Sequence, residues 1–580
     1  MKNFFVLIAL VATFVPAFFV VQKVGELEQW QGVLPKGTTD SKYYYARIHE
    51  VVDGHPFIGN PYAYEHKDAL SPAFFLPDVV SAVPVLLGVP FNIAVLVNVF
   101  VWSFIFLMLA FTLLRLLQIQ NWWAFSWSII AYICSYSFML RPTVMQIVYP
   151  VFLLFLIVLL KFLYEPFVRR RIIWLSLTAA VSFYTYTYLA YIVLLTFAFV
   201  FIWFLFTHRY KELRALITAG IGTAILLIPF GIYTLLQMGD PNYFETMTRI
   251  GLVYTHVPSI EAFFYGRWVA IGLVALGLLW IFFPKKEEGS SARKVFWFAT
   301  GAGLLSGLFL NVVTGVELTL GVHIGRFIFP WMALVLGAGL YEWYQARPIN
   351  IGANKIGATY ALVAISLVVL SVGVLRSIDR GVDFFGFNNR GETVADVQPY
   401  SAPLAWLEAN VPEQSVIWAN DSIAQYIPIM TRHYTLFAPQ TVLHNMSALE
   451  LEDRYLLSRS FGTLSVDDLW RDLGLYIGAG AFKLQTLAQN QRAWICGVAT
   501  RFIGPRECLP YTDGITLKGE AYFKTLAQRF EEIKKNQVTI LQQFKVKYLI
   551  IDRAHDDFGR IFLKKAVYDN GRFVIVPLPL

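Results

Sequence analysis

The sequence predicts a polytopic α-helical membrane protein with about 11 transmembrane helices and a C-terminal extracytoplasmic α/β domain. Of the 580 residues, 57% are hydrophobic and only 15% are charged, which lies outside the range of soluble domains. Apolar stretches fill much of residues 1–376, and a mixed, globular composition follows in residues 377–580. Because basic residues of membrane proteins gather in cytoplasmic loops, we interpret the formal net charge of +8 as topology and expect no nucleic-acid binding.

The expected spans follow from the length of an apolar helix that crosses a bilayer, about 20 residues for roughly 30 Å of hydrocarbon. Residues 172–186 and 188–206 are divided only within "TYTYLAY", so they are two spans or one broken helix. Residues 74–90 are apolar but contain Asp78 and three prolines, which favours a re-entrant or interfacial helix. The expected spans are residues 3–22, 91–117, 122–140, 146–164, 172–186, 188–206, 215–237, 268–284, 294–314, 327–345 and 356–376.

The loops between these stretches alternate between rich and poor in Lys and Arg, as cytoplasmic and outer loops do. The rich connections include "RRR" at 169–171, "HRYKELR" at 208–214 and "PKKEEGSSARK" at 284–294. This alternation predicts a cytoplasmic N-terminus, a first outer loop at residues 23–72 and an outer C-terminal domain, in the inner membrane of a bacterium or archaeon. Alternatively, residues 1–22 are a cleaved signal peptide, which also leaves residues 23–72 outside.

The C-terminal region alternates helical and strand patterns, which predicts a small α/β sandwich. The helix at 421–431 is expected to begin at Asp421 as its N-cap. The other expected helices are residues 401–411, 519–536 and a short one in "IFLKKAVYDN" (561–570), and the expected strands are residues 415–420, 434–437, 546–552 and "RFVIVPL" (572–578).

The first outer loop contains the best candidate for a catalytic residue. In "TTDSKYYYAR" (38–47), Asp40 precedes three tyrosines and Arg47. A carboxylate beside the membrane can act as a general base on an acceptor nucleophile, and Arg47 could hold a phosphate or fix the carboxylate. Asp is also a favoured N-cap, so Asp40 could cap the helix "SKYYYARIHEVV". The two roles are compatible, because a carboxylate at a helix N-terminus is well oriented.

A second polar cluster, "YEHKD" at 64–68, lies later in the same loop. Glu65, His66 and Asp68 could supply two oxygens and one nitrogen to a divalent cation, or they form an ordinary solvated loop. His66 could equally orient a substrate. The alternatives stay open at the level of the sequence.

A third cluster lies where a late span begins, in "VELTLGVHIGRF" (316–327). Arg326 stands at the start of the span and His323 three residues before it. This spacing puts cationic donors at the depth of a lipid phosphate, and a planar guanidinium can bind phosphate oxygens in pairs. The simpler alternative is an interfacial Arg whose charged end reaches to water.

Two further features bear on function. Cys496 and Cys508, in "CGVATRFIGPREC", are expected to form a disulfide if the region is extracytoplasmic and to be reduced thiols otherwise. The interiors of the expected spans are nearly free of charge, although transporters and channels usually place ionisable residues there. The chemistry is therefore expected at the outer surface, which favours an enzyme that handles a lipid-borne substrate.

This layout resembles the GT-C class of polytopic glycosyltransferases, which take sugars from polyprenyl-phosphate or polyprenyl-diphosphate donors. The features that carry the resemblance are Asp40 soon after the first span with Tyr43 and Tyr44 behind it, the many spans and the outer domain. The stretch "LAWLEANVPEQSVIWANDSIAQYIPIMTRHYTLF" (404–437) is similar to the helix, strand, turn, helix unit that opens the outer domain of oligosaccharyltransferases. Protein mannosyltransferases and lipid aminoarabinosyltransferases are the other similar members of the class.

The resemblance implies roles for individual residues. It makes Asp40 the catalytic Asp and Arg326 the donor-phosphate ligand, and it places Glu317 near a loop Glu of the oligosaccharyltransferases. The segment "RPTVMQIVYP" (141–150) lacks the carboxylates of the second outer loop of the class, so a divalent cation, Mg²⁺ or Mn²⁺, would depend on Asp40 with Glu65 or Asp68. "WANDSIAQY" (418–426) keeps Asp421 but lacks the Trp-Trp and Gly of the family's turn, so recognition of a peptide sequon is not expected.

We therefore expect an inverting membrane glycosyltransferase that uses a polyprenyl-phosphate-linked sugar and an extracytoplasmic glycan, lipid or protein as acceptor. Asp40 is the expected base, and Arg326, His323 and Arg47 are the expected phosphate ligands. The alternative is a non-catalytic membrane protein, such as a transporter, a flippase or a glycan-binding protein.

Overall fold

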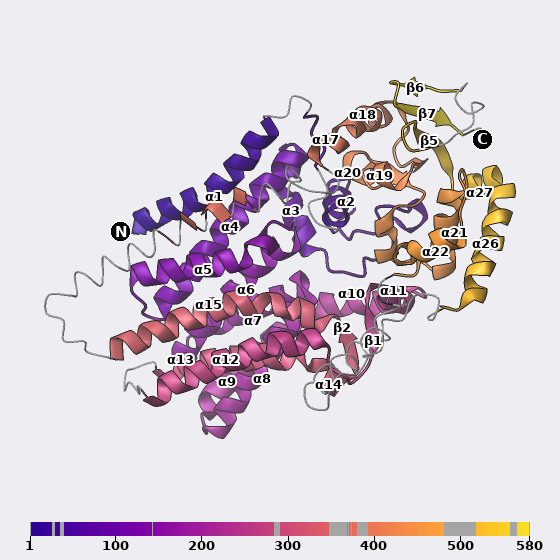
Figure 1. The fold of residues 1–580 in the computed structure, drawn as a ribbon. Helices are drawn as coiled ribbons and strands as arrows, with labels where there is room; N and C mark the ends of the chain where they lie inside the picture. Colours follow the sequence, from indigo (N-terminus) through magenta and orange to yellow (C-terminus); the bar gives the residue numbers. More distant parts are fainter. Residues whose placement is uncertain are drawn as a thin grey trace, which may run out of the picture.

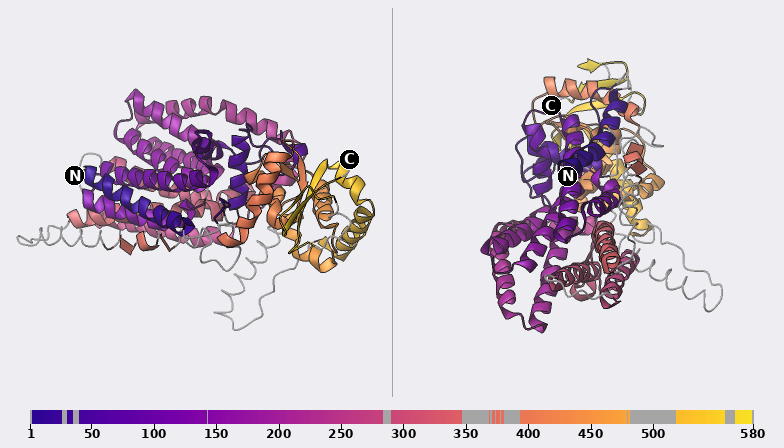
Figure 2. Two further views of the ribbon diagram at one scale, coloured as in Figure 1. Left: turned by 90° about the horizontal axis from the view of Figure 1, so that it is seen from above. Right: turned by 90° about the vertical axis from the view of Figure 1, so that its left-hand side faces the viewer.

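The structure, a computed structural model, combines a bundle of long helices with a C-terminal domain at one end of the bundle (Figure 1). Seen from above, several bundle helices run side by side along the length of the molecule, and the C-terminal domain lies beyond their ends (Figure 2). The structure describes residues 2–25, 30–34, 40–141, 143–282, 290–346, 368, 371–372, 374–376, 378–379, 393–478, 480, 518–556 and 565–578.

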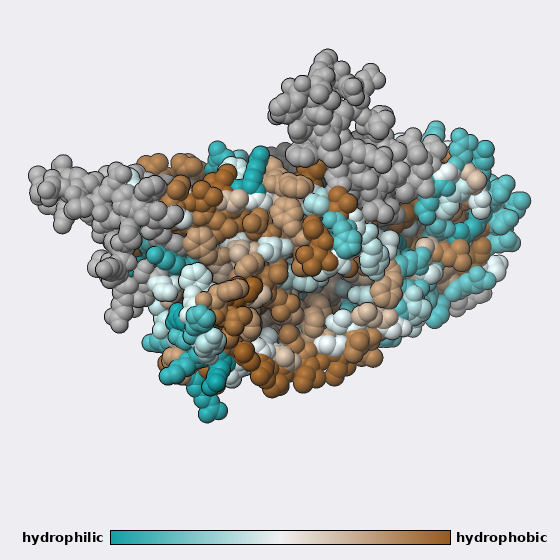
Figure 3. Space-filling view, turned by 90° about the horizontal axis from the view of Figure 1, so that it is seen from below, coloured by the Kyte–Doolittle hydropathy of each residue, from teal (hydrophilic) through white to brown (hydrophobic). Residues whose placement is uncertain are grey.

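The bundle makes this chain a multi-pass membrane protein. Among the described residues, six helices are long and apolar enough to cross a membrane. Two further helices, separated by a short break and bent by 49° relative to each other, would together add a seventh span. On the face shown in Figure 3, hydrophobic residues gather over the bundle and hydrophilic ones over the end that carries the C-terminal domain. The six helices are α1 (Lys2–Gly25), α4 (Phe91–Leu116), α6 (Val144–Tyr164), α8 (Thr187–Phe206), α12 (Ile260–Phe282) and α15 (Leu320–Ala346), and the bent pair is α9 (Tyr210–Leu226) with α10 (Ile228–Met238).

The number of spans that meet these criteria is smaller than the expected number of about 11. The first ten expected stretches are helical, but three of these helices do not combine sufficient length with sufficient hydropathy. Most of the eleventh stretch, residues 356–376, lies outside the described residues. The expected pair near residues 172–206 is present as two separate helices that meet at Tyr186, whose extended backbone (φ −163°, ψ 122°) ends one and precedes the next. The three helices are α5 (Asn121–Met139), α7 (Arg169–Thr185) and α13 (Ser290–Leu308).

Short elements connect the bundle to the C-terminal domain. Helix α2 (Ser41–Val52) packs against α3 (Leu76–Leu86), and α3 is too short to cross a bilayer. Chain reversal after α2 is made by Gly54, whose positive φ of 96° favours glycine. The other short elements are η1 (Tyr64–His66), α11 (Tyr243–Ile250), α14 (Leu310–Thr314) and the antiparallel pair β1 (Leu252–Tyr254) and β2 (Val316–Leu318).

The C-terminal domain is built on a five-stranded mixed sheet with the order β4-β3-β5-β7-β6. Strand β3 is parallel to both β4 and β5, and β7 runs antiparallel to β5 and β6. The strands are β3 (Val416–Trp418), β4 (Tyr434–Thr435), β5 (Val546–Asp552), β6 (Tyr568–Asp569) and β7 (Phe573–Pro577). The helices are α17 (Val394–Val397), η2 (Gln398–Tyr400), α18 (Ser401–Asn410), α19 (Asp421–Ala424), α20 (Ile427–Met430), η3 (Pro439–Leu443), α21 (Ala448–Arg459), α22 (Val466–Arg471), α23 (Leu473–Tyr476), α26 (Glu520–Lys535) and α27 (Gln537–Gln543).

Two expectations for this domain were wrong in detail. The helical stretch after β3 begins at Asn420 as N-cap, because the Asn420 carboxamide accepts hydrogen bonds from the backbone N–H groups of Ser422 and Ile423. Asp421 instead forms an ion pair with Arg459. The expected short helix at 561–570 ends in a strand, β6, which pairs with β7, and residues 561–564 of that stretch lie outside the described residues. Pairing with a neighbouring strand outweighs local helical spacing there.

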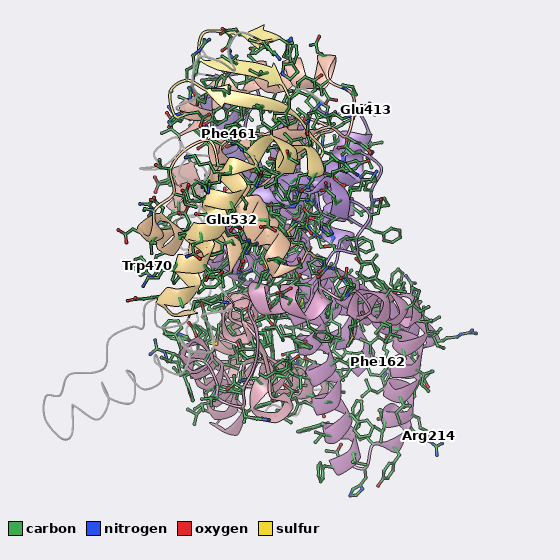
Figure 4. All side chains as sticks on the ribbon, turned by 90° about the vertical axis from the view of Figure 1, so that its right-hand side faces the viewer. Phe162, Arg214, Glu413, Phe461, Trp470 and Glu532 are labelled. Atoms are coloured by element: carbon green, nitrogen blue, oxygen red, sulfur yellow. The ribbon has the colours of Figure 1, made fainter. Side chains whose placement is uncertain are left out.

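The two parts of the molecule share a continuous core. One cluster of buried side chains extends from Trp331 in the bundle through Tyr45 of α2 to Ile417 and Phe573 of the sheet. A second cluster fills the space between the sheet and helices α21 and α26. Figure 4 shows the C-terminal domain from outside, with Phe461 and Glu532 near its face. Because burial of apolar surface is the main stabilising contribution in folding, this shared core is expected to fix α2 relative to the sheet.

Candidate active site

Asp40 lies at the beginning of α2, and its carboxylate forms an ion pair with Arg141. Asp40 is the N-cap residue of the helix, as the sequence predicted, but its side chain makes no capping hydrogen bond. Arg141 follows α5 directly, in the turn that leads to α6. The Asp40 side chain is 43% exposed and that of Arg141 only 13%. The pair therefore offers an accessible carboxylate held by a largely enclosed guanidinium.

Arg141 also contacts an aromatic residue of α2. Its guanidinium lies 5.2 Å from the centre of the Tyr44 ring and within 3.4 Å of the Tyr44 hydroxyl. Burial and the positive charge of Arg326 lower the pKa of Arg141 to about 10. The repulsion between the two guanidinium groups means that they lie within electrostatic reach of each other. Arg141, with Asp40 on one side and Arg326 within electrostatic reach, belongs to a group with an excess of positive charge, which favours an anion.

Arg326 lies in the first turns of α15 and is held by residues at the α7–α8 junction. Its Nη1 lies 3.3 Å from the hydroxyl of Tyr186, the extended residue between the two helices. The same hydroxyl is hydrogen-bonded to Nδ1 of His323. The His323 ring stacks on Tyr188 with 4.2 Å between ring centres and an interplanar angle of 5°. His323 thus orients Tyr186, and Tyr186 in turn contacts Arg326.

Both arginines retain unused hydrogen-bonding capacity. The Nε groups of Arg141 and Arg326 are buried and have no hydrogen-bond partner within the described part of the chain. Buried donors usually have partners, so an unpaired pair of this kind is a sign of a binding site. Guanidinium groups bind phosphate oxygens through N–H groups of this kind.

Arg47, another expected phosphate ligand, is bound to groups of the protein. Its guanidinium is 1% exposed and forms an ion pair of 2.7 Å with Asp78 of α3. It also donates to the Ser71 hydroxyl at 2.6 Å and to the carbonyl of Phe74 at 3.2 Å. With its donors used in this way, Arg47 joins α2 to α3 and the loop before it.

The residues of the "YEHKD" cluster contact the C-terminal domain. Glu65 forms an ion pair with Arg454, and Nε2 of His66 lies 2.8 Å from the carboxylate of Glu450. Asp68 is exposed. The cluster is therefore not brought together with Asp40 around one cavity.

A divalent cation does not fit the residues that the structure describes. Within this part of the chain, no group of three or more His, Cys, Asp or Glu side chains is placed to hold a metal ion. Glu65 is used by Arg454, and Asp40 by Arg141.

Glu317 supports the helix that carries Arg326. It lies in β2, is 1% exposed, and its carboxylate accepts a hydrogen bond of 3.0 Å from the backbone N–H of Leu320, the first residue of α15. A carboxylate at a helix N-terminus is favourable because it satisfies a free backbone N–H and interacts well with the helix dipole.

Two residues of this site, Arg141 and Tyr186, were not predicted from the sequence. Arg141 appeared only as an isolated basic residue of an outer loop, and Tyr186 appeared only as part of an aromatic break between two apolar stretches. A signal for Arg141 was present, because an Arg at the outer end of a span is costly unless it has a partner. Cys496 and Cys508 lie outside the described residues.

No protein-family model and no curated relative match this chain. Its fold is similar to that of the archaeal oligosaccharyltransferase AglB from Archaeoglobus fulgidus in complex with an inhibitory peptide and a dolichol-phosphate, at 12% identity and a TM-score of 0.44 over 95% of this chain and 69% of that one. It is also similar to ArnT from Cupriavidus metallidurans bound to undecaprenyl phosphate, at 12% identity and a TM-score of 0.41 over 100% and 98% of the two chains. The structural neighbours are GT-C membrane glycosyltransferases.

Proposed function

We propose that this protein is an inverting membrane glycosyltransferase that moves a sugar from a polyprenyl-phosphate-linked donor to an extracytoplasmic acceptor. The observation that supports this most is the grouping of one accessible carboxylate, Asp40, with two guanidinium groups, Arg141 and Arg326, at one end of an apolar helical bundle. The carboxylate suits proton transfer, the two cations suit a phosphate, and the bundle suits a lipid chain.

In the proposed reaction, a hydroxyl group of the acceptor attacks the anomeric carbon of the donor sugar. The bond between that carbon and the phosphate oxygen breaks, and polyprenyl phosphate leaves with the electron pair. Asp40 takes the proton of the attacking hydroxyl. Attack opposite the leaving group inverts the anomeric centre. Arg141 and Arg326 stabilise the negative charge that the leaving phosphate gains.

The ion pair with Arg141 gives Asp40 a second state. Arg141 holds the carboxylate in an ion pair. A donor phosphate competes for the same guanidinium, because its two anionic oxygens would lie between two cations. Once Arg141 turns to the phosphate, the carboxylate is released to the acceptor. Base activation would then follow donor binding, which protects the donor from premature hydrolysis.

The test is sugar transfer by the full-length protein in proteoliposomes, supplied with a panel of synthetic polyprenyl-phosphate sugars. The product is detected by mass spectrometry of lipid and acceptor fractions. Asp40→Asn, which keeps the size of the side chain, is expected to reduce the turnover rate about 100-fold or more. Asp40→Glu should retain part of the activity. Wild-type rates in both Asp40→Asn and Asp40→Ala would remove Asp40 from the chemistry. Lipid-linked glycan profiling of a deletion strain would identify the accumulating donor.

A further inference from the structure

Gln146 is a buried amide whose hydrogen-bonding groups are all unused. It lies in the first turn of α6 and is 1% exposed. Neither its Nε2 nor its Oε1 has a hydrogen-bond partner within the described part of the chain. Burying an amide without partners is unfavourable, and native proteins rarely do so away from sites that bind water or a ligand. The neighbours of Gln146 on α6 bear on whether its amide binds water or a ligand.

The helical spacing places Gln146 toward the candidate active site. Residues three positions apart on a helix differ by about 60° in direction. Thr143, the residue just before α6, has its hydroxyl within reach of the Asp78 carboxylate of α3. Tyr149, three residues after it, donates a hydrogen bond of 3.0 Å to the backbone carbonyl of Arg326. Gln146 therefore lies within about 60° of the face of α6 on which Tyr149 contacts the turn of α15 that carries Arg326.

Tyr44 connects Arg326 with the other side chains of the candidate active site. Its hydroxyl interacts electrostatically with Arg326 and with Asp78. The Tyr44 hydroxyl also contacts Arg141, the partner of Asp40. The unpaired amide thus borders the same group of side chains that would hold the donor phosphate.

The chemistry of an amide narrows the ligand. The NH₂ group donates two hydrogen bonds and the carbonyl oxygen accepts hydrogen bonds. An ionised phosphate diester offers only acceptors, so it could satisfy the NH₂ group but would leave Oε1 unpaired. A sugar hydroxyl both donates and accepts and can therefore satisfy both ends of the amide. We infer that Gln146 binds hydroxyl groups of the donor sugar and so helps to select that sugar. This inference rests on the proposed transferase function.

The inference is tested with Gln146→Met, which has a similar volume and no amide. Its activity is compared with the wild type on the donor that the wild type uses and on monodeoxy analogues of that donor. We expect Gln146→Met to lower kcat/KM for the full donor about 10- to 100-fold. With the wild type, kcat/KM for the analogue that lacks the contacted hydroxyl should be lower than for the full donor by a similar factor. With Gln146→Met, kcat/KM for that analogue and for the full donor should be nearly equal. Such non-additivity is the signature of a direct contact.

Binding of sugar-free polyprenyl phosphate, measured by native mass spectrometry, separates the alternatives. Gln146→Met should bind this lipid as the wild type does, and the exposed residue Gln120 gives a matched control, Gln120→Leu. Unchanged transfer by Gln146→Met would overturn the inference and assign the amide to a structural water. Equal loss of polyprenyl phosphate binding would also overturn it, since the contact would then be to phosphate. If the wild type neither transfers sugar nor binds polyprenyl phosphate, the proposed function itself fails, whatever Gln146 does.

Discussion

The carboxylate of Asp40 and the guanidinium of Arg141 form an ion pair that ties the first turn of α2 to the turn between α5 and α6. The start of α2 and the turn after α5 thereby meet at one point beside the bundle. Because Arg141 is also within electrostatic reach of Arg326, one residue connects the proposed base to the proposed phosphate site. Arg141 is therefore the residue whose replacement is most informative about the site.

Replacing Arg141 by Gln should weaken the binding of polyprenyl phosphate and lower the transfer rate about 100-fold, because a donor to the developing phosphate charge is lost. The transfer rate of Arg141→Lys should lie between those of the wild type and Arg141→Gln, since an ammonium keeps the charge but not the paired N–H geometry. The measurements are binding by native mass spectrometry and turnover in proteoliposomes. Arg214 in α9 is exposed and lies in the helical part well away from the C-terminal domain (Figure 4), so Arg214→Gln serves as the matched control. Wild-type lipid binding by Arg141→Gln would limit Arg141 to holding Asp40.

Asp78→Asn should destabilise the protein by about 3–5 kcal/mol, because it leaves the buried Arg47 cation without its partner. The apolar double variant Arg47→Met with Asp78→Leu should recover much of that stability. Thermal unfolding in detergent measures both. The opposite result, unchanged unfolding with weaker polyprenyl phosphate binding in Arg47→Met, would return Arg47 to the phosphate site that the sequence suggested.

The sequence predicts more of the fold of this protein than of its candidate active site. Apolar length locates the helices of the bundle, since it depends only on neighbouring residues, and strand patterns locate β3, β5 and β7 within a residue or two. The sequence also identifies Asp40, as a carboxylate in a loop that follows the first apolar stretch, and Arg326, as a cation where a late apolar stretch begins. It does not pair Asp40 with Arg141 or Arg47 with Asp78, since these contacts depend on how separate helices pack.

The loss of Arg454 should loosen the C-terminal domain from the first outer loop. Arg454 is fully buried, donates to Glu450 at 2.8 Å and to the carbonyl of Leu436 at 3.1 Å, and forms an ion pair with Glu65. Arg454→Met leaves two carboxylates without their cation, and we expect a loss of about 3–5 kcal/mol. Limited proteolysis should then cut the first outer loop faster than in the wild type. Arg471→Met, in an exposed pair with 70% of the Arg side chain accessible, should leave the proteolysis rate unchanged.

The stability of the protein should fall between pH 7.5 and pH 5 because of His444. Its ring is fully buried, with centroids 5.3 Å from that of Tyr43 and 5.6 Å from that of Tyr62. Burial, together with the charges of Arg47 and Arg249, lowers the pKa of His444 to about 3 from an ordinary 6.5.

Between pH 6.5 and pH 3 the unfolded chain therefore binds a proton at this position that the folded chain does not, so acid favours unfolding. At pH 5 the effect amounts to about 2 kcal/mol. The effect of His444 is separate from that of Glu450. Burial raises the pKa of Glu450, but the hydrogen bond from His66 and the charge of Arg454 outweigh burial and hold this pKa at about 2. The stability that Glu450 contributes is therefore lost only below pH 4.5. His444→Phe keeps an aromatic ring between the two tyrosines and removes the proton-binding group. Its unfolding temperature should change less between pH 7.5 and pH 5 than that of the wild type, and an equal change in both would show that another group is responsible.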